Sequence, residues 1–471
     1  MRKRLIGLLL LCGLPLLSQA QSLDEIIRIA QDSTLTAFQS RYEYEFQIQK
    51  NAQFEALRKP QLELRVAPNY QRMINDITRD YVYLRNYNRF STAAQLKLTQ
   101  KVLGLGGEAY VGSQVLWSEY FNGDQAGRLR DFIATPLIAG YQQSLLGYNP
   151  YRWEKAAEDQ RLEAARRQLR YDLHRIAEEA TRRFFRLACA QGMLDMCERN
   201  KQTADTLYAI AREKASIAIV TLAELRSLEL QRLNAANALL SARNEEHLAR
   251  ESLAAYLRTP VLPAGSRLAV PTATDQVLLT DDEALMMARA NSAALQQQQV
   301  ALTEARHQQE KTRKEQGVKV GFGLDLGMQQ LGSTFVGAYQ HPQLYMVGTV
   351  TLSVPLMDHG AARKGHAAAA AWTSREEMAL QEVDRALAED VHTTLDNLRS
   401  HRQLLAHTAE AVAMADEVFE LTAENYANGL CDINTYSLAQ NRRDEAYNQH
   451  LTALAGYWTT YYHLLTLTQH E

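Results

Sequence analysis

Two kinds of hydrophobic periodicity follow each other along the chain. Between residues 346 and 356, apolar and small polar residues alternate, which is the period of a β-strand. From residue 361 to about 426, apolar residues recur at helical spacing with scarcely an interruption. Pro355 and Gly360 lie between the two patterns, and Gly360 suits a corner that needs a positive φ. This stretch predicts a strand, a sharp corner and a very long helix.

The same arrangement occurs twice. A second corner, with Gly147 and Pro150, precedes another long helical pattern 211 positions earlier. The helix-capping pattern at residues 22–25 likewise returns 258 positions later, at residues 280–283. Each capping pattern opens a helical run that gives way to alternation. We therefore interpret the chain as an internal duplication, with the order helix, strand, strand, long helix and return helix in each copy.

The predicted domain boundaries follow from this duplication. A basic start, an apolar stretch and small residues before a cleavage point indicate a signal peptide at 1–20. The first repeat occupies 21–259, a linker with several prolines 260–279, and the second repeat 280–471. The first repeat carries about 47 additional residues between its strands, within an insert at 70–143.

The long helices are predicted at 150 to about 213 and at 361 to about 426, with return helices at about 221–257 and 433–468. Such a helix is roughly 95 Å long at ~1.5 Å per residue, several times the usual length. Apolar residues recur at every seventh position of the second long helix, which is typical of a coiled-coil seam. These positions are Val391, Leu398, Leu405, Val412, Phe419 and Tyr426.

Composition and segment length restrict the class of protein. The net charge of -3 and pI near 6.5 do not indicate a nucleic-acid partner. Beyond the predicted signal peptide, no run of 18 apolar residues occurs, so a membrane would have to be entered through strands. Two strands per repeat give four per chain, too few to close a barrel, and open edges are not tolerated in lipid. Three chains would supply twelve strands; the 70–143 insert would change that count or form an extracellular cap.

No enzymatic or metal chemistry is indicated. The glycines at 104–107 are followed by a strand-like pattern, which argues against a dinucleotide-binding turn. The histidine pairs lack zinc-site spacing. The cysteines of the predicted mature chain, Cys189, Cys197 and Cys431, are expected to fill apolar packing positions. We predict no catalytic residue, no cofactor and no metal.

Five motifs occur in order along the mature chain and together resemble the TolC family of trimeric outer-membrane channels. They lie at residues 23–25, 145–149, 281–285, 355–360 and 426–429. The corner at 145–150 and the long insert resemble Bacteroidetes-type members. The resemblance implies an α+β membrane protein whose twelve-stranded β-barrel, shared by three chains, continues into a twelve-helix coiled-coil α-barrel in the periplasm.

The resemblance also implies a function and partners. The chain would be the outer-membrane exit channel of a tripartite efflux or type I secretion system. It would be a passive conduit in outer-membrane lipid, opened by a periplasmic membrane-fusion adaptor and an inner-membrane pump. From the residues alone, a periplasmic coiled-coil scaffold or adhesin with no pore is the alternative.

The family gates its channel at the periplasmic tip, which carries Glu224, Tyr426 and Gly429 over to this chain as gate candidates. Asp432 is a further gate candidate, because it could supply a ring of acids from one turn earlier than the family's ring. The family's arginine position is occupied by Cys431, and its two ring-aspartate positions by Thr435 and Leu438. An alternative role exists for both acids, because Glu224 could form a capping box with Thr221 and Asp432 could be an N-cap. Arg442, Arg443 and Asp444 are expected either to line a tunnel or to lie on a solvated helix face.

Overall fold

The computed structural model describes residues 21–73, 76–77, 82–83, 87–122, 129–145, 148–216, 220–258, 266–272, 279–428 and 430–469. The predicted signal peptide and the corner residue Gly147 lie outside the described residues. The chain forms two compact units. The helical unit comprises Met1–Glu43, Arg167–Ala293 and Asp384–Glu471, and the sheet unit comprises Tyr44–Arg166 and Ala294–Val383. Each unit combines parts of both sequence repeats.

The helices of the two repeats match one by one in length. The first repeat contains α1 (Leu23–Ser33), α2 (Leu35–Leu57), α3 (Pro150–Ser216) and α4 (Leu222–Leu257). The second contains α5 (Asp281–Asn291), α6 (Ala293–Glu315), α7 (Ala361–Ala427) and α8 (Ile433–Thr468). Both sets have 11, 23, 67 and 36 residues in that order. The prediction of long helices and return helices is confirmed.

Each opening helical run is broken into two helices, which the periodicity did not predict. The backbone leaves the helical region at Thr34, with ψ at 148°, and at Ser292, with ψ at 121°. Thr34 then caps α2, because its hydroxyl oxygen accepts a hydrogen bond from the Ala37 amide at 3.3 Å. Serine and threonine side chains compete in this way with continuous helical backbone. The prediction of one helical run after each capping pattern is therefore wrong in this respect.

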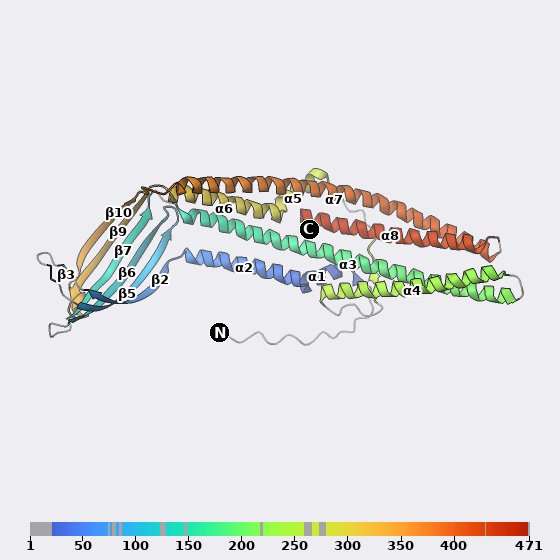
Figure 1. The fold of residues 1–471 in the computed structure, drawn as a ribbon, viewed down its shortest axis with the longest axis horizontal. Helices are drawn as coiled ribbons and strands as arrows, with labels where there is room; N and C mark the ends of the chain where they lie inside the picture. The colour runs from blue at the N-terminus through green and yellow to red at the C-terminus, as the bar shows by residue number, and fades with distance from the viewer. Residues whose placement is uncertain are drawn as a thin grey trace. The chain divides into compact units, whose positions relative to one another are not determined.

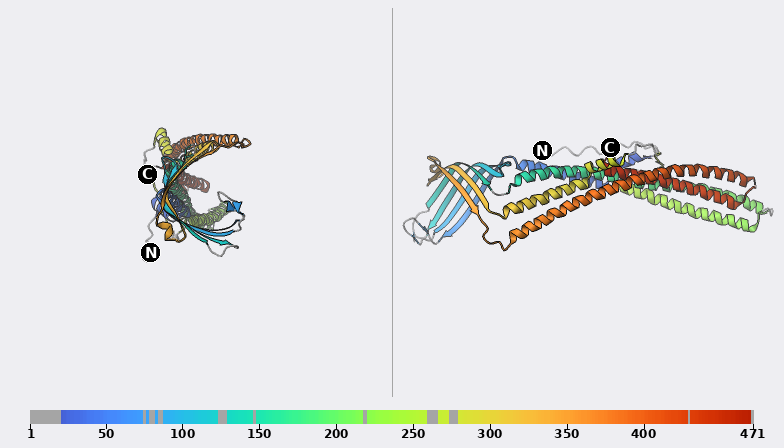
Figure 2. Two further views of the ribbon diagram at one scale, coloured as in Figure 1. Left: turned by 90° about the vertical axis from the view of Figure 1, so that its left-hand side faces the viewer. Right: turned by 90° about the horizontal axis from the view of Figure 1, so that it is seen from above.

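The sheet unit contains six long strands (Figure 1). They are β2 (Gln61–Met73), β5 (Tyr87–Val102), β6 (Gly107–Asn122), β7 (Leu129–Ser144), β9 (Lys319–Gly332) and β10 (Gln343–Ser353). Their spatial order is β10-β9-β7-β6-β5-β2, and all neighbours are antiparallel. The sheet is curved (Figure 2). Short pairs join β1 (Gln21–Ser22) to β8 (Leu268–Ala269) and β3 (Asp76–Ile77) to β4 (Val82–Tyr83), and a 3-10 turn covers Gly337–Tyr339.

The expected number of four strands per chain is wrong. The insert supplies β5 and β6, which lie between β2 and β7 as members of the main sheet. The insert therefore changes the strand count, which is the alternative that the sequence analysis left open. The reason is physical: strand pairing joins residues far apart in sequence, so alternation alone does not determine whether an extra hairpin enters a sheet.

The corners between strands and long helices are held by local hydrogen bonds. Gly360 has a φ of 80°, as predicted, and the preceding His359 also has a positive φ of 52°. The Asp358 carboxylate accepts bonds from the Gly360 and Ala362 amides, both at 2.9 Å, and these bonds lower its pKa. Pro355 lies just beyond the end of β10. Asp358 therefore caps α7, a role that the sequence analysis missed.

At the first corner, Pro150 is the first residue of α3, where its missing N–H costs nothing. The side-chain oxygen of Asn149 accepts a hydrogen bond from the Tyr151 amide at 3.1 Å. Its side-chain nitrogen donates to the Leu103 carbonyl oxygen at 3.0 Å. Asn149 thus links the start of α3 to the turn between β5 and β6.

The helical unit is built around paired helices, with α4 running beside α3 and α8 beside α7 (Figures 1 and 2). Its largest core contains Phe184, Leu253 and Leu398, all with no exposed surface. Val391 is also fully buried and Leu405 packs against this cluster, which agrees with the predicted heptad seam. The seam continues to Phe419 and Tyr426 in a second cluster.

His463 joins three helices of this unit. Its Nδ1 lies 3.2 Å from Glu178 of α3 and its Nε2 3.5 Å from Asp390 of α7. These contacts, led by the Glu178 hydrogen bond, raise the pKa of His463 above its ordinary value. A raised pKa in the folded state means that protonated His463 stabilises the fold below its unfolded pKa, and this contribution is lost as pH rises through the folded value.

We therefore expect His463→Gln to lower the denaturant midpoint most below about pH 6, with a smaller effect above about pH 8. Unfolding of the purified wild type and variant, followed by circular dichroism at both pH values, measures the two differences. An equal loss at both pH values would show that the histidine acts through packing and not through its charge.

Candidate functional site

The six-stranded sheet has one continuous apolar face. Directly paired residues point to the same side of a sheet, and alternate residues share a face. Leu64 pairs with Leu96 of β5, and Leu326 of β9 pairs with both Ala139 of β7 and Met346 of β10. The apolar face is completed by Leu62, Val66, Leu98, Val111, Leu137, Val320, Phe322, Leu324, Met328, Leu344, Val350 and Leu352.

This apolar face is exposed in the single chain. Exposure reaches 67% for Leu62, 70% for Met346 and 71% for Val350. Apolar side chains over six strands form a patch far larger than a soluble monomer exposes. Alternation of an apolar and a polar face over about ten residues per strand is typical of transmembrane strands. The face is therefore suited to contact with lipid.

The opposite face is polar and internally connected. The Lys97 Nζ lies 3.8 Å from the centroid of the Tyr110 ring, and the Tyr110 hydroxyl donates to the Asp325 carboxylate. The Tyr110 ring lies over Gly140 of β7, where the Cβ atom of any other residue would collide with the ring. A chain of contacts thus runs over β5, β6, β7 and β9 on the face suited to water.

Among the described residues, no helix is both long and apolar enough to cross a membrane. The same part of the chain contains no group of three or more His, Cys, Asp or Glu side chains that could hold a metal ion.

The predicted gate residues lie at one end of the helical unit, where α3 and α7 end and α4 and α8 begin. The Asp432 carboxylate accepts hydrogen bonds from the Thr435 hydroxyl at 2.6 Å and the Thr435 amide at 2.8 Å, and both lower its pKa. The Thr221 hydroxyl oxygen accepts a hydrogen bond from the Glu224 amide at 3.2 Å. The N-cap at Asp432 and half of the capping box at Thr221 are therefore present. Gly429 lies outside the described residues.

Aromatic residues gather beside these caps. The Tyr426 ring is 5.3 Å from that of Tyr436, which is 5.5 Å from Phe419. The Arg443 guanidinium lies 4.0 Å from the Phe419 ring centroid. Burial, followed by the nearby charges of Glu224 and Cys431, raises the pKa of Tyr426. The fold thus brings Tyr426 close to Glu224, two gate candidates from different repeats.

Three features of this cluster were missed by the sequence analysis. Tyr436 was not identified, although its spacing from Asp432 places it one turn into α8. The side chains of Arg443 and Asp444 are only 16% and 13% exposed and pair at 3.1 Å, so the expectation of a solvated face is wrong for them. The Asp444 carboxylate also accepts a hydrogen bond from the side-chain amide of Asn200 in α3. Only tertiary packing determines which side of α8 is covered.

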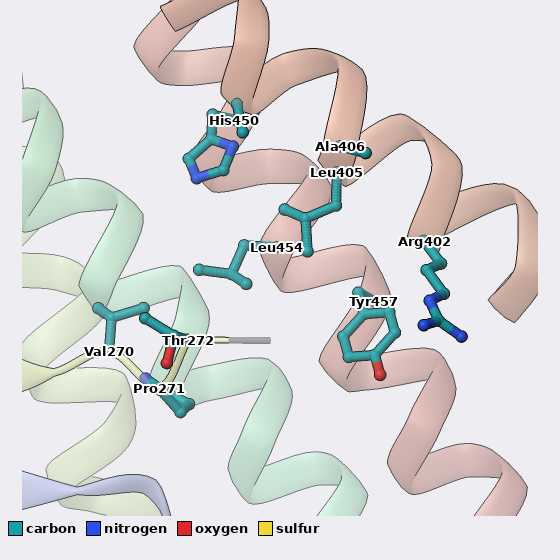
Figure 3. A pocket seen from close by; sticks show the side chains of 10 residues that line it. Val270, Pro271, Thr272, Arg402, Leu405, Ala406, His450, Leu454 and Tyr457 are labelled. Atoms are coloured by element: carbon teal, nitrogen blue, oxygen red, sulfur yellow. The ribbon is translucent and has the colours of Figure 1, made fainter. Parts of the chain in front are cut away.

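A pocket of about 440 Å³ lies elsewhere in the helical unit (Figure 3). It is formed where Val270 and Pro271 pack near Leu405 of α7 and Leu454 of α8. His450 lines it and its Nδ1 is 3.2 Å from the Thr408 hydroxyl. Arg402 and His450 are the ionisable side chains among the described lining residues, and we assign no ligand to this pocket.

The sequence profile of the family described as outer membrane efflux protein matches residues 284–468. The matched residues lie in the second sequence repeat, which therefore resembles this family. The resemblance inferred from the five motifs is confirmed, and the family's proteins are channels and not enzymes. No curated protein matches the sequence.

Solved structures share the family's fold with this chain. A membrane protein from Pseudomonas aeruginosa superposes with a TM-score of 0.68 at 13% identity, covering 96% of this chain and 91% of that chain. The outer membrane protein VceC from Vibrio cholerae gives 0.67 at 12% identity, covering 95% of both chains. The CmeC outer membrane channel from Campylobacter jejuni gives 0.67 at 12% identity, covering 95% and 85%. At these identities the similarity establishes the fold alone.

Proposed function

We propose that this chain is the outer-membrane exit channel of a tripartite efflux or type I secretion system. The observation that carries the proposal is the six-stranded sheet with one exposed apolar face and with two edges, at β2 and β10, that no other described strand pairs with. In lipid every backbone polar group needs a partner, so a sheet with open edges must be completed by other copies. Three copies are the number that the family resemblance implies.

The helices support a periplasmic location for the rest of the chain. Charged ion pairs cover them, such as Arg182 with Glu178 at 3.1 Å and Arg186 with Glu245 at 2.9 Å. Such surfaces are stable in water and costly in lipid. We place the adaptor contact at the ends of the long helices, near Glu224 and Asp432, and assign the energy source to the inner-membrane pump. The pore itself would be a passive conduit.

The test is the state of the purified full-length protein. We expect a trimer in detergent that migrates as an oligomer on gels unless heated, and that produces stable conductance steps in planar bilayers. A monomer that stays in solution without detergent would refute the proposal and favour a periplasmic scaffold or adhesin.

Two variants at Asp432 test whether this gate candidate affects ion selectivity. Three copies of this carboxylate around a narrow opening would attract cations. Asp432→Asn keeps an oxygen that can cap α8 but removes the charge, so we expect the cation-over-anion permeability ratio to fall by about twofold or more. Asp432→Ala removes both charge and cap.

Reversal potentials in asymmetric salt measure this ratio for the wild type and both variants. Asp432→Asn and Asp432→Ala should lose selectivity equally, while only Asp432→Ala loosens the first turn of α8. An unchanged ratio in both variants would assign Asp432 to capping alone.

A further inference from the structure

We infer that copies of this chain close an eighteen-stranded barrel whose wall includes the hairpin β5–β6, with β10 of one copy paired to β2 of the next. The inference rests on the proposed trimeric channel and specifies its membrane part. The partner of each free sheet edge is the opposite edge of a second copy of this chain.

The hairpin is an integral part of the sheet. Every residue of β2 pairs with β5, from Gln61 opposite Thr99 to Met73 opposite Tyr87. β5 pairs with β6 over their whole lengths without a register shift. The contact from Lys97 through Tyr110 to Asp325 ties both hairpin strands to β9 of the second repeat.

The apolar face also runs through the hairpin. Leu98 of β5 lies between Leu62 of β2 and Val111 of β6, and Leu96 lies between Leu64 and the small polar Ser113. A hairpin serving as a plug or an external cap would not continue this face in register with its neighbours. The hairpin therefore belongs to the lipid-facing wall.

The strand connections allow β5 and β6 to join the sheet without changing the direction of β2 or β7. Because β2, β5, β6 and β7 are successively antiparallel, β5 starts at the sheet end where β2 finishes, and β6 finishes where β7 starts. At its other end the hairpin closes in a tight turn at residues 103–106, with Gly106 at a φ of 73°. No helix is attached to this turn, so the hairpin widens the sheet and adds nothing to the helices.

The two free edges are complementary. Successive antiparallel pairings across the sheet leave β10 antiparallel to β2. The two strands are 13 and 11 residues long, and almost all of their described side chains are exposed on both faces. Pairing β10 of one copy with β2 of the next therefore continues the antiparallel order and removes every open edge from the lipid.

Strand number determines the diameter of such a barrel. With strands about 4.8 Å apart and tilted by about 40°, eighteen strands give a diameter of roughly 36 Å, against roughly 24 Å for twelve. Four helices, α2, α3, α6 and α7, adjoin the long strands in each chain, so three chains supply twelve. Twelve helices spaced 8–10 Å apart form a ring of roughly 31–39 Å. The width of the eighteen-stranded barrel lies within the range of this ring.

Cysteine cross-linking tests the edges in the full-length protein with Cys189, Cys197 and Cys431 changed to alanine. Arg65→Cys on the polar face of β2 is combined in turn with Val347→Cys, Thr349→Cys and Thr351→Cys on the polar face of β10. The matched controls combine Arg65→Cys with Met346→Cys or Val350→Cys, whose side chains point to the opposite face. Native mass spectrometry counts the copies, and electron-microscopy projections along the axis give the barrel diameter.

We expect disulfide-linked oligomers on denaturing gels for at least one polar-face pair, none for the controls, a mass of three copies and a ring of roughly 36 Å. A trimer without polar-face cross-links, or with a ring of roughly 24 Å, would overturn the eighteen-stranded barrel and leave the proposed function intact. A dimer or monomer would instead overturn the trimeric channel on which the inference depends.

Discussion

Replacing Phe184 with alanine is expected to lower the free energy of unfolding by about 3–5 kcal/mol. Phe184 of α3 has no exposed surface and packs edge-on against Phe185 at 5.3 Å between ring centroids. It belongs to the core that joins α1, α3, α4, α7 and α8 of the helical unit. Removing the ring leaves a cavity that close-packed helices fill only in part, so both burial and packing are lost.

The measurement is the denaturant midpoint of purified wild type and variant, followed by circular dichroism. Phe184→Leu is the matched control, since it keeps most of the apolar volume and should cost less than about 1.5 kcal/mol. Equal effects of the two substitutions would show that the ring's shape, and not the cavity, determines stability at this position.

The second large effect is expected at Arg250. Its guanidinium pairs with Glu246. Its two terminal nitrogens also donate to Ser266, Nη1 to the hydroxyl oxygen at 3.1 Å and Nη2 to the carbonyl oxygen at 3.2 Å. The side chains of Arg250 and Glu246 are only 11% and 15% exposed. We expect Arg250→Met to cost about 3–5 kcal/mol, because the substitution leaves the carboxylate of Glu246 largely buried without its partner.

Two comparisons distinguish the loss of the ion pair with Glu246 from the loss of the arginine side chain itself. The double variant Arg250→Met with Glu246→Leu should recover most of the stability, because no buried charge then remains. Arg186→Ala removes an exposed pair with Glu245, 57% and 53% exposed, and should cost less than about 1 kcal/mol. If the double variant were as unstable as Arg250→Met, the bonds to Ser266 would carry the effect instead.

The helices could be predicted from sequence because their signals are local. Heptad spacing from Val391 to Tyr426 depends only on residues within a few turns, and capping patterns at helix starts reflect hydrogen bonds over three residues. The Thr280 side chain and Glu283 indeed bond reciprocally. The positive φ of Gly360 was predictable for the same reason, because glycine alone lacks the side chain that resists it.

The candidate site was predictable only in part. The N-caps at Asp432 and Thr221 are local and were anticipated. The contacts of Tyr426 with Tyr436, and the burial of Arg443 beside Phe419, depend on how α7 packs against α8. Periodicity shows that a helix has a covered side, but not which long side chains reach across to a neighbour.

The sequence by itself determined the duplicated order of elements, the lengths of the long and return helices, the corners and the resemblance to the family, since each depends on periodic patterns or short motifs. Tertiary structure alone decided that the sheet has six strands, that β5 and β6 lie in its wall, and that Thr34 and Ser292 break the opening helices. The physical reason is that a strand is stabilised by partners distant along the chain, and a helix mainly by its own neighbours.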